Sequence, residues 1–350
     1  MHKLNEIIEN SFISKLAEMF PRSRHQCNLL HESDAELIHL PGTDIILAVK
    51  TDSIVEEIQS GLYSDPYLIG WMTVTVNASD LAAVGAEPLG LLLNETLPPD
   101  IDRDYLKKLQ EGIRDACEQY GFYVLGGDTN FSNAMQMGAA AIGIIPSGKL
   151  MTRMGGRCDD LLFASGPLGL GSAFALLGYL GDSKANKDSM NYKPVARIKE
   201  GLLLREYASC CMDTSDGALA TLDQLMRLNN IGFEINVPME DLLDPAVLKI
   251  AGRYNLPPWI FLAGPHGEFE LIFSIPPVKL DEFLLEAGRI SWTPIQIGRV
   301  DGKPEVRIIN ERVKAILPTG KIRNLFDEVN QDAEQYLKNL LMIDKEIAAN

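Results

Sequence analysis

Apolar residues recur at helical spacing in three segments of the N-terminal half. Residues 3–19 carry an apolar side chain every three or four positions, which predicts an amphipathic helix. A second helix is expected over 66–86, beginning at a proline and ending near Gly85. A third is expected over 102–121, where one face is apolar, the other is charged and the last residue is glycine.

Shorter apolar runs between these helices predict β-strands. The runs at 36–40 and 44–52 flank the turn residues PGT, so we expect them to form a hairpin. The run LGLLLNETL at 89–97 is typical of a buried strand. Two more strands are expected at 122–129 and 136–146, around a glycine turn.

The alternation of strand and helix patterns starts again after a boundary near 147–152. The expected elements that follow are a strand at 159–166, helices at 170–181, 194–208 and 217–230, and further strands and helices to about residue 310. The tail at 327–349 is amphipathic and charged, which predicts a surface helix. We therefore expect a two-domain α/β (α+β) fold, with domains at 1–148 and 149–326 and a helical tail at 327–350.

One uncharged stretch, residues 161–181, is long enough to span a bilayer. Pro167, several glycines and acidic flanking residues argue against a membrane helix. A buried strand, a glycine turn and a buried helix explain the stretch better. We therefore expect no membrane partner.

The composition narrows the functional class. The chain has 350 residues, of which 46% are hydrophobic and 23% charged, and its formal net charge is -16. No cluster of lysine and arginine stands out, which argues against a nucleic-acid or anionic-membrane surface. An acidic protein that handles phosphates would need metal ions to do so.

The cysteines and the N-terminal segment indicate a cytoplasmic location. The five cysteines have no CxxC or zinc-binding spacing, and the pair Cys210 and Cys211 is a poor disulfide candidate. Reduced thiols in the cytoplasm are the simplest explanation. Residues 1–12 contain no apolar core of the signal-peptide type.

The stretch CMDTSDGALATL at 210–221 places two carboxylates three positions apart in a predicted strand-to-helix turn. One interpretation is helix capping, with Asp213 or Ser215 as the cap and Asp216 at the positive end of the helix. The other is a ligand site. Isolated acids next to small or hydroxyl residues occur elsewhere too, at Asp34, Asp52, Asp80 and Asp128. Scattered aspartates without a histidine or cysteine cluster fit Mg²⁺ better than zinc.

The motifs TDSIVEE, VNASDLAAVGAEP, LGGDT, TRMGG, MDTSDGAL and FELIF occur in this order between about residues 30 and 275. Together they resemble the thiamine-monophosphate kinase family, within the superfamily of aminoimidazole ribonucleotide synthetase. The resemblance implies two aminoimidazole-ribonucleotide-synthetase-like domains, with the N-terminal domains pairing into a homodimer that shares a β-barrel. It also implies ATP as substrate, Mg²⁺ as cofactor and direct transfer of the γ-phosphoryl group to thiamine phosphate. No catalytic residue is then expected beyond those that position substrates and metal.

The resemblance also assigns individual residues. It implies metal binding by Asp34, Asp52, Asp80, Asp128, Asp213 and Asp216, with Thr51 as a hydroxyl on the metal side. It further implies ATP contacts by Thr51, by a turn at Gly127 and Asp128, and by Arg153 and Ser215.

The chain departs from the family pattern mostly where the acceptor would bind. Gln59 replaces a histidine, Gly267 replaces an acid, and only Phe326 is available for an aromatic contact. Glu268 and Glu270 bracket Phe269, so one of the two glutamates is expected to face the cleft. The candidate substrate residues are therefore Gln59, Gly267, Glu268 and Phe326.

Two departures lie elsewhere. Ser33 replaces an acid in the glycine-rich motif of the family, and Lys50 replaces a hydroxyl residue before Thr51 and Asp52. Lys50 is either a solvated lysine at a strand end or a charge that substitutes for a metal or binds a phosphate. His266 is either a surface residue or part of an altered acceptor pocket.

Three functions remain open on this evidence. The first is an ATP- and Mg²⁺-dependent kinase that phosphorylates thiamine phosphate. The second is a related kinase with a different small phosphorylated acceptor, because a site built for one acceptor discriminates against others. The third is a non-catalytic nucleotide-binding protein.

Overall fold

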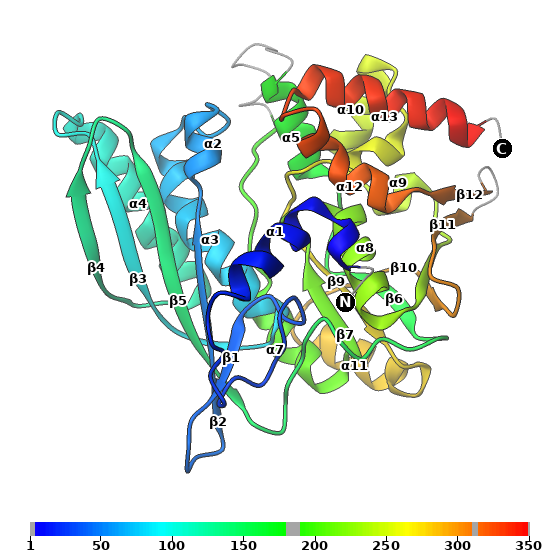
Figure 1. The fold of residues 1–350 in the computed structure, drawn as a ribbon, viewed down its shortest axis with the longest axis horizontal. Coiled ribbons are helices and arrows are strands. Elements are labelled where there is room, and N and C mark those ends of the chain that lie inside the picture. The colour runs from blue at the N-terminus through cyan, green and yellow to red at the C-terminus, as the bar shows by residue number, and fades with distance from the viewer. Residues whose placement is uncertain (1–3, 180–189, 310–313, 349–350) are drawn as a thin grey trace.

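The computed structural model describes residues 4–179, 190–309 and 314–348. It contains a five-stranded and a seven-stranded β-sheet, one in each half of the chain. Figure 1 places the first sheet and its helices on one side and the second sheet with its helices on the other. Among the described residues, neither sheet closes on itself into a barrel.

The five-stranded sheet is formed by the N-terminal half. In spatial order its strands are β1 (Glu36–His39), β2 (Ile45–Ser53), β5 (Gln136–Pro146), β3 (Glu87–Leu97) and β4 (Val124–Phe131). The expected hairpin of β1 and β2 is confirmed, and only β3 and β4 pair in parallel. The expected glycine turn is wrong, because Gly126 and Gly127 lie inside β4. A Cβ on Gly127 would lie 2.2 Å from the carbonyl oxygen of Leu93, so the approach of β4 to β3 requires glycine there.

Two long helices, α3 (Pro66–Ala83) and α4 (Arg103–Tyr120), pack against each other beside this sheet, with α3 against β2 and β5. Their ends follow the signals in the sequence. The side chains of Asp65 and Asp102 accept hydrogen bonds from backbone N–H groups in the first turns of α3 and α4. Gly121 ends α4 in the left-handed conformation, with φ of 74°.

In the described part of the chain, the face of β3 and β4 opposite these helices is exposed. Along β3, Leu91 and Leu93 are buried, whereas Leu92, which points to the other face, is 42% exposed. The edge strand β4 is exposed along its whole length, and Phe131 at its end is 68% exposed. The run at 89–97 is therefore buried on one face only, and the expectation of a fully buried strand is wrong.

The seven-stranded sheet is formed by the C-terminal half. Its spatial order is β12 (Lys314–Leu317), β11 (Val306–Ile309), β8 (Gly232–Ile235), β10 (Ile295–Asp301), β6 (Leu161–Ala164), β9 (Leu271–Ile275) and β7 (Cys210–Asp213). Only β11 and β8 pair in parallel. With one parallel pair in each sheet, the fold is mixed α+β.

The helices in the described part of this half include those predicted at 170–181, 194–208, 217–230 and in the tail, and also a helix at 319–328 that was not predicted. They are α5 (Leu170–Tyr179), α7 (Ile198–Tyr207), α8 (Ala218–Asn229), α9 (Met239–Leu242), α10 (Pro245–Tyr254), α11 (Leu280–Arg289), α12 (Thr319–Glu328) and α13 (Ala333–Ala348), with 3₁₀ turns η2 (Pro258–Leu262) and η3 (Pro277–Lys279). In its described part, the uncharged stretch 161–181 forms β6 and α5, as expected. None of the described helices has the length and apolar character needed to cross a bilayer. All five cysteines are free thiols.

The N-terminal helix contacts α12, which comes from the other end of the sequence. The helix expected over 3–19 is shorter: a 3₁₀ turn, η1 (Leu4–Glu6), precedes α1 (Ile8–Ala17). The tail is more than a surface helix, because the Tyr336 hydroxyl on α13 is buried and donates a hydrogen bond of 2.6 Å to the carbonyl of Ala263. Trp259 also donates a hydrogen bond of 2.7 Å to Asp344 on α13.

Candidate functional site

A cavity of about 940 Å³ lies between the two halves of the chain. The N-terminal half lines it with α1, the loop before β1, β2, α3 and the short helix α2 (Val55–Gln59). The C-terminal half lines it with the turn after β7, the loop at 265–269 and α12. Most of its charged lining comes from residues that the sequence singles out.

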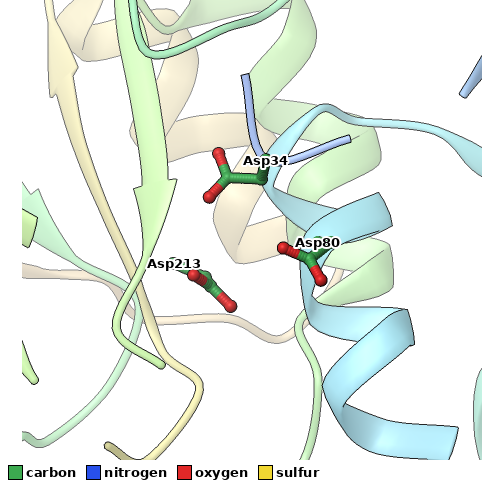
Figure 2. A group of neighbouring side chains, drawn as sticks. All are labelled: Asp34, Asp80 and Asp213. Carbon is green, nitrogen blue, oxygen red and sulfur yellow. The ribbon is translucent and has the colours of Figure 1, made fainter. Parts of the chain in front are cut away.

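Three buried carboxylates form a cluster, and two of them, Asp34 and Asp80, line this cavity. Asp34 lies in the loop before β1, Asp80 lies within α3, and Asp213 ends β7. One oxygen of each lies within 4.8 Å of the others, and Figure 2 shows the three groups around a common space. Residues far apart in the sequence are therefore brought together, although Asp80 lies in a helix and not at a strand end or turn.

Burial raises the pKa values of two of these carboxyl groups. The pKa of Asp213 is raised to about 6, chiefly by burial and then by the neighbouring charge of Asp34. The pKa of Asp80 is raised well above its ordinary range, mainly because the group is buried. Both carboxylates are therefore held in an environment that disfavours their negative charge and favours a cation beside them.

Two basic side chains already contact the cluster. Nη2 of Arg153 lies 2.8 Å from Oδ1 of Asp34. Nζ of Lys50 lies 3.3 Å from Oδ2 of Asp80 and 3.8 Å from Oδ2 of Asp52. The neighbouring acids raise the pKa of Lys50, so its ammonium group is charged at neutral pH. Lys50 is therefore part of the site and not a solvated lysine.

One carboxylate oxygen of the cluster has the properties of a metal ligand. Asp34 is 4% exposed, and its Oδ2 has no hydrogen-bond partner among the described residues. A buried carboxylate oxygen without a partner is costly. Oxygen ligands from carboxylates are those that Mg²⁺ prefers. The donor set therefore fits Mg²⁺, with Asp34, Asp80 and Asp213 as the group that would hold it.

The turn after β7 does not serve as a helix cap. The N-cap of α8 is Gly217, with φ of 84° and no side-chain capping bond, so the capping interpretation of Asp213 and Ser215 is wrong. Asp213 instead accepts hydrogen bonds from Ser79, at 2.6 Å, and from Ser215, at 3.1 Å. Ser215 and Asp216 both line the cavity.

Thr51 and Asp52 on β2 also line the cavity. The Thr51 hydroxyl donates a hydrogen bond of 3.0 Å to the carbonyl of Ala139 on β5. Gly127 and Asp128 are not among the lining residues. Asp128 lies on the exposed edge strand β4, where Asn130 donates a hydrogen bond of 2.7 Å to it. The structure thus separates this pair from the other predicted site residues.

None of the four expected substrate residues lines the cavity. Gln59 is exposed at the end of α2, and Phe326 packs edge-on against Tyr336 with ring centroids 5.4 Å apart. Gly267 is buried, and a Cβ there would lie 1.5 Å from the carbonyl oxygen of Thr214. The backbone therefore leaves no room for an acidic side chain at this position.

Both glutamates beside Phe269 are turned away from the cavity. Glu268 accepts hydrogen bonds from Thr214, at 3.0 Å, and from the backbone N–H of Gly169, at 2.9 Å, and burial raises its pKa to about 8. Glu270 pairs with Arg197. The expectation that one glutamate faces the cleft is wrong, because Phe269 lines the cavity instead. Its φ of 60° is unusual for a side chain of this size and marks local strain.

His266 belongs to the cavity wall and is not a surface residue. It is 6% exposed, and its Nε2 lies 3.1 Å from the hydroxyl oxygens of both Tyr63 and Tyr192. Burial lowers its pKa to about 4, so the ring is neutral at pH 7. Tyr63 comes from the N-terminal half, and no local pattern in the sequence indicates that the two tyrosines converge on this histidine.

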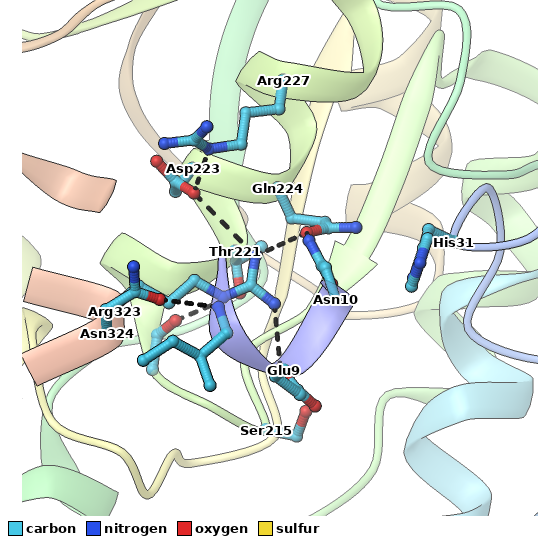
Figure 3. A network of polar contacts seen from close by, with 12 residues as sticks. Glu9, Asn10, His31, Ser215, Thr221, Asp223, Gln224, Arg227, Arg323 and Asn324 are labelled. Atoms are coloured by element: carbon cyan, nitrogen blue, oxygen red, sulfur yellow. Dashed lines mark hydrogen bonds and ion pairs between the residues drawn. The ribbon is translucent and has the colours of Figure 1, made fainter. Parts of the chain in front are cut away.

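Sequence patterns also missed the end of the cavity shown in Figure 3. Arg323 on α12 donates hydrogen bonds to Gln224, at 2.5 Å, and to Glu9 on α1, at 3.2 Å. Asn10 on α1 also donates to Gln224, at 2.9 Å. Glu9, Asn10 and Arg323 all line the cavity. These residues lie at opposite ends of the sequence, so spacing along the chain carries no signal for them.

Glu57 on α2 is a further cavity residue that the sequence patterns did not single out. Burial raises its pKa to about 7. It lies two positions before Gln59, the residue expected to contact substrate. Glu56 on the same helix lines the cavity as well.

Comparison with known proteins gives consistent matches. The family model for the AIR synthase related protein, N-terminal domain, matches residues 32–145. Thiamine-monophosphate kinase from Buchnera aphidicola subsp. Acyrthosiphon pisum is 30% identical over 282 residues, covering 76% of this chain and 84% of the relative. Thiamine-monophosphate kinase from Pyrococcus horikoshii is 31% identical over 276 residues, covering 79% of this chain and 85% of the relative.

The fold is also that of a solved relative. A structure described as AaThiL complexed with AMPPCP and TMP superposes with a TM-score of 0.70 at 24% identity, covering 85% of this chain and 91% of the other. The mixed α+β architecture with two sheets is therefore the AIR-synthase-like fold. The identities of 30% and 31% to the two thiamine-monophosphate kinases, over most of both chains, establish that the chain belongs to the thiamine-monophosphate kinase family.

Proposed function

We propose that this protein transfers the γ-phosphoryl group of ATP to thiamine phosphate, forming ADP and thiamine diphosphate. One observation carries the proposal: Asp34 and Asp80 line a large cavity and form a carboxylate cluster with Asp213, in a chain of the thiamine-monophosphate kinase family. Phosphoryl transfer depends mainly on positioning and on neutralising charge, which a site of this kind is suited to supply.

Mg²⁺ would be held by these three aspartates, with Asp52 and Asp216 lining the same cavity. When bound, it would neutralise the charge of the triphosphate and of the phosphate acceptor. The unpartnered Oδ2 of Asp34 supports this assignment. Bringing two phosphorylated molecules together in an acidic cavity requires such positive charge.

The chain's own residues would orient the two phosphates. Arg153 is fixed by Asp34, so its remaining N–H groups are available at the cavity for a phosphate oxygen. Ser215 and Thr51 add hydroxyl groups to the cavity lining, from the C-terminal and N-terminal halves respectively. Because the acceptor is a phosphate oxygen, no proton has to be removed before transfer, and no residue is needed as a general base.

We also propose that the protein is a homodimer of the two-domain chain, with domains at 1–148 and 149–326 and the tail at 327–350. The uncovered face of the five-stranded sheet and its exposed edge strand support this assembly, since Leu92, Tyr123 and Phe131 are all exposed there. A shared β-barrel would cover this face, and Gly127 and Asp128 would then act at or near the interface. Light scattering tests this assembly, and we expect Phe131→Asp to yield monomers.

A second acceptor is a candidate because none of the four expected substrate residues lines the cavity and Gly267 leaves no space for a side chain. In that case the ATP and Mg²⁺ chemistry is retained and another small phosphorylated molecule accepts the phosphoryl group. In either case we expect the protein to act in the cytoplasm.

The deciding experiment is product analysis with purified protein, Mg²⁺-ATP and thiamine phosphate. We expect thiamine diphosphate from the wild type, a loss of about a thousandfold or more in Asp213→Asn, and no loss in Asp100→Asn, which removes an exposed carboxylate. Absence of product, with thermal stabilisation by Mg²⁺ and a non-hydrolysable ATP analogue, would favour a different acceptor. Absence of that stabilisation as well would contradict the proposed site, since a ligand at 100 times its Kd stabilises by about 2.7 kcal/mol.

A further inference from the structure

Lys50 lies on β2 with its ammonium group inside the carboxylate cluster. Its side chain is 27% exposed, while that of Asp80 is 7% exposed and that of Asp52 is 43% exposed. Nζ is shared between Asp80, at 3.3 Å, and Asp52, at 3.8 Å. The lysine therefore bridges a buried acid of α3 and a partly exposed acid of its own strand.

The two basic residues at the cluster occupy different places. Arg153 is anchored by Asp34, at 2.8 Å, and by a weaker contact of 3.4 Å to the carbonyl of His31. Lys50 contacts a separate pair of acids, Asp52 and Asp80. Each cation thus neutralises its own part of the group formed by Asp34, Asp52, Asp80 and Asp213.

The unpartnered oxygen points to a ligand beside Asp34, an acid that is not among the ion-pair partners of Lys50 in the described part of the chain. Oδ1 of Asp34 pairs with Arg153 and its Oδ2 has no hydrogen-bond partner among the described residues. Asp80 pairs with Lys50, whereas the carboxylate of Asp213 accepts hydrogen bonds from two serine hydroxyl groups. The demand for an external cation is therefore greatest at Asp213 and at the unpartnered oxygen of Asp34.

We propose that Lys50 is an internal cation that takes the place of one divalent ion between Asp52 and Asp80. The inference rests on the proposed function, because it assumes that Mg²⁺ and nucleotide bind in this cavity. Two cations cannot both lie against the same pair of carboxylates without strong repulsion. The ammonium group donates hydrogen bonds and has no lone pair, so it neutralises charge but cannot join the coordination of a neighbouring metal. Lys50 thus lowers the number of divalent ions that the site takes up.

The test is the number of Mn²⁺ ions bound per chain, measured by electron paramagnetic resonance with a non-hydrolysable ATP analogue present. We expect Lys50→Met to bind one more Mn²⁺ than the wild type. The affinity of Lys50→Met for this additional ion is expected to be at least about tenfold higher than that of the wild type. Lys50→Arg keeps the charge and is expected to bind the wild-type number. Lys107→Met, which removes an exposed charge on α4, is the matched control and is also expected to leave the number unchanged.

A second measurement, the Tm with and without Mn²⁺, tests whether the variant folds and how strongly metal stabilises it. Lys50→Met leaves Asp80 buried beside no cation, so we expect a lower Tm than the wild type without metal. Addition of Mn²⁺ is then expected to raise the Tm of Lys50→Met more than that of the wild type or of Lys107→Met. Lys50→Arg is expected to behave as the wild type does.

The possible results separate this inference from the proposed function. Equal numbers and affinities of Mn²⁺ in the wild type and Lys50→Met, with an equal gain in Tm, would overturn the role of Lys50 alone. Absence of Mn²⁺ uptake with nucleotide in both proteins would overturn the proposed function and this inference with it. An extra ion in Lys107→Met as well would show a general charge effect and would also overturn the inference.

Discussion

The hydroxyl group of Ser79 donates a buried hydrogen bond of 2.6 Å to Oδ2 of Asp213. Ser79 lies on α3, immediately before Asp80, and Asp213 ends β7 in the other half of the chain. One turn of α3 therefore supplies one acid of the cluster and positions another. The relative placement of the two halves is coupled in this way to the geometry of the candidate metal site.

Removing this donor is expected to weaken both folding and metal binding. We expect Ser79→Ala to lower the free energy of unfolding by about 2 kcal/mol, because a hydrogen bond to a buried charged group is lost. Urea unfolding at pH 7.5 measures the change. Ser60→Ala, at an exposed position with a weaker bond of 3.3 Å, is the control and is expected to change the value little. An equal effect of the two substitutions would contradict the coupling of α3 to β7.

The charge of Asp213 is expected to destabilise the metal-free protein. Its pKa is raised to about 6, above its ordinary value of 3.8, because burial and Asp34 disfavour the anion. The folded state therefore holds this proton to higher pH than the unfolded state does, and stability falls as the pH rises from about 4 to 6. We expect Asp213→Asn to lack this loss. Between pH 4 and 7.5, its free energy of unfolding relative to that of the wild type is expected to rise by on the order of 2 kcal/mol.

Urea unfolding of both proteins without metal, at pH 4 and at pH 7.5, tests whether the wild type loses stability relative to Asp213→Asn as the pH rises. With Mg²⁺ and nucleotide the order is expected to reverse, because the amide is a weaker metal ligand than the carboxylate. A variant that is less stable than the wild type at pH 7.5 without metal would show that the charge of Asp213 is already neutralised by its neighbours.

Local chemistry in the sequence predicted most of the helices and part of the site. The amphipathic pattern and the terminal residues of 102–121 are local signals, and α4 follows them closely. The sequence groups six aspartates by their small or hydroxyl neighbours and by the family resemblance, and the structure brings three of them, Asp34, Asp80 and Asp213, together.

The remaining features depend on contacts that no short stretch encodes. The bond between Glu9 and Arg323 joins residues 314 positions apart. The pairing of Lys50 with Asp80 depends on how α3 crosses β2, which hydrophobic periodicity does not specify. The exposure of Asp128 follows from its place on an edge strand, and strand order in a sheet is set by long-range pairing.

His266 is expected to make the protein sensitive to mild acid. Its pKa is lowered to about 4 by burial, below its ordinary value of 6.5, so between these values the unfolded chain binds a proton that the folded protein does not. Stability from this residue is complete above pH 6.5 and falls as the pH is lowered. At pH 5 the loss relative to pH 8 is about 2 kcal/mol.

The variant His266→Gln keeps a polar side chain beside Tyr63 and Tyr192 without a proton to gain in this range. Between pH 8 and 5, we expect the free energy of unfolding of this variant to fall by about 2 kcal/mol less than that of the wild type. Urea unfolding of both proteins at the two pH values measures the difference. Parallel losses in the two proteins would indicate that His266 is protonated in the folded state.

The packing of Gly267 decides whether an acid can be restored at the position where the family pattern has one. A Cβ there would lie 1.5 Å from the carbonyl oxygen of Thr214, and the backbone N–H of Gly267 donates a hydrogen bond of 2.8 Å to the carbonyl of Ser215. A side chain must therefore displace the turn that carries Asp213. We expect Gly267→Ala to lower the free energy of unfolding by about 3 kcal/mol and to reduce Mg²⁺-nucleotide binding.

Gly252→Ala is the matched control, because the space around the Cβ position at Gly252 on α10 is open and alanine favours a helix by about 1 kcal/mol. Thermal and urea unfolding of both variants, with and without Mg²⁺-nucleotide, measure the contrast. A Gly267→Ala protein as stable as the wild type would mean that the loop at 265–269 can move away from Thr214. An acid at position 267 could then enter the cavity, and the difference from the family pattern would not by itself exclude thiamine phosphate as the acceptor.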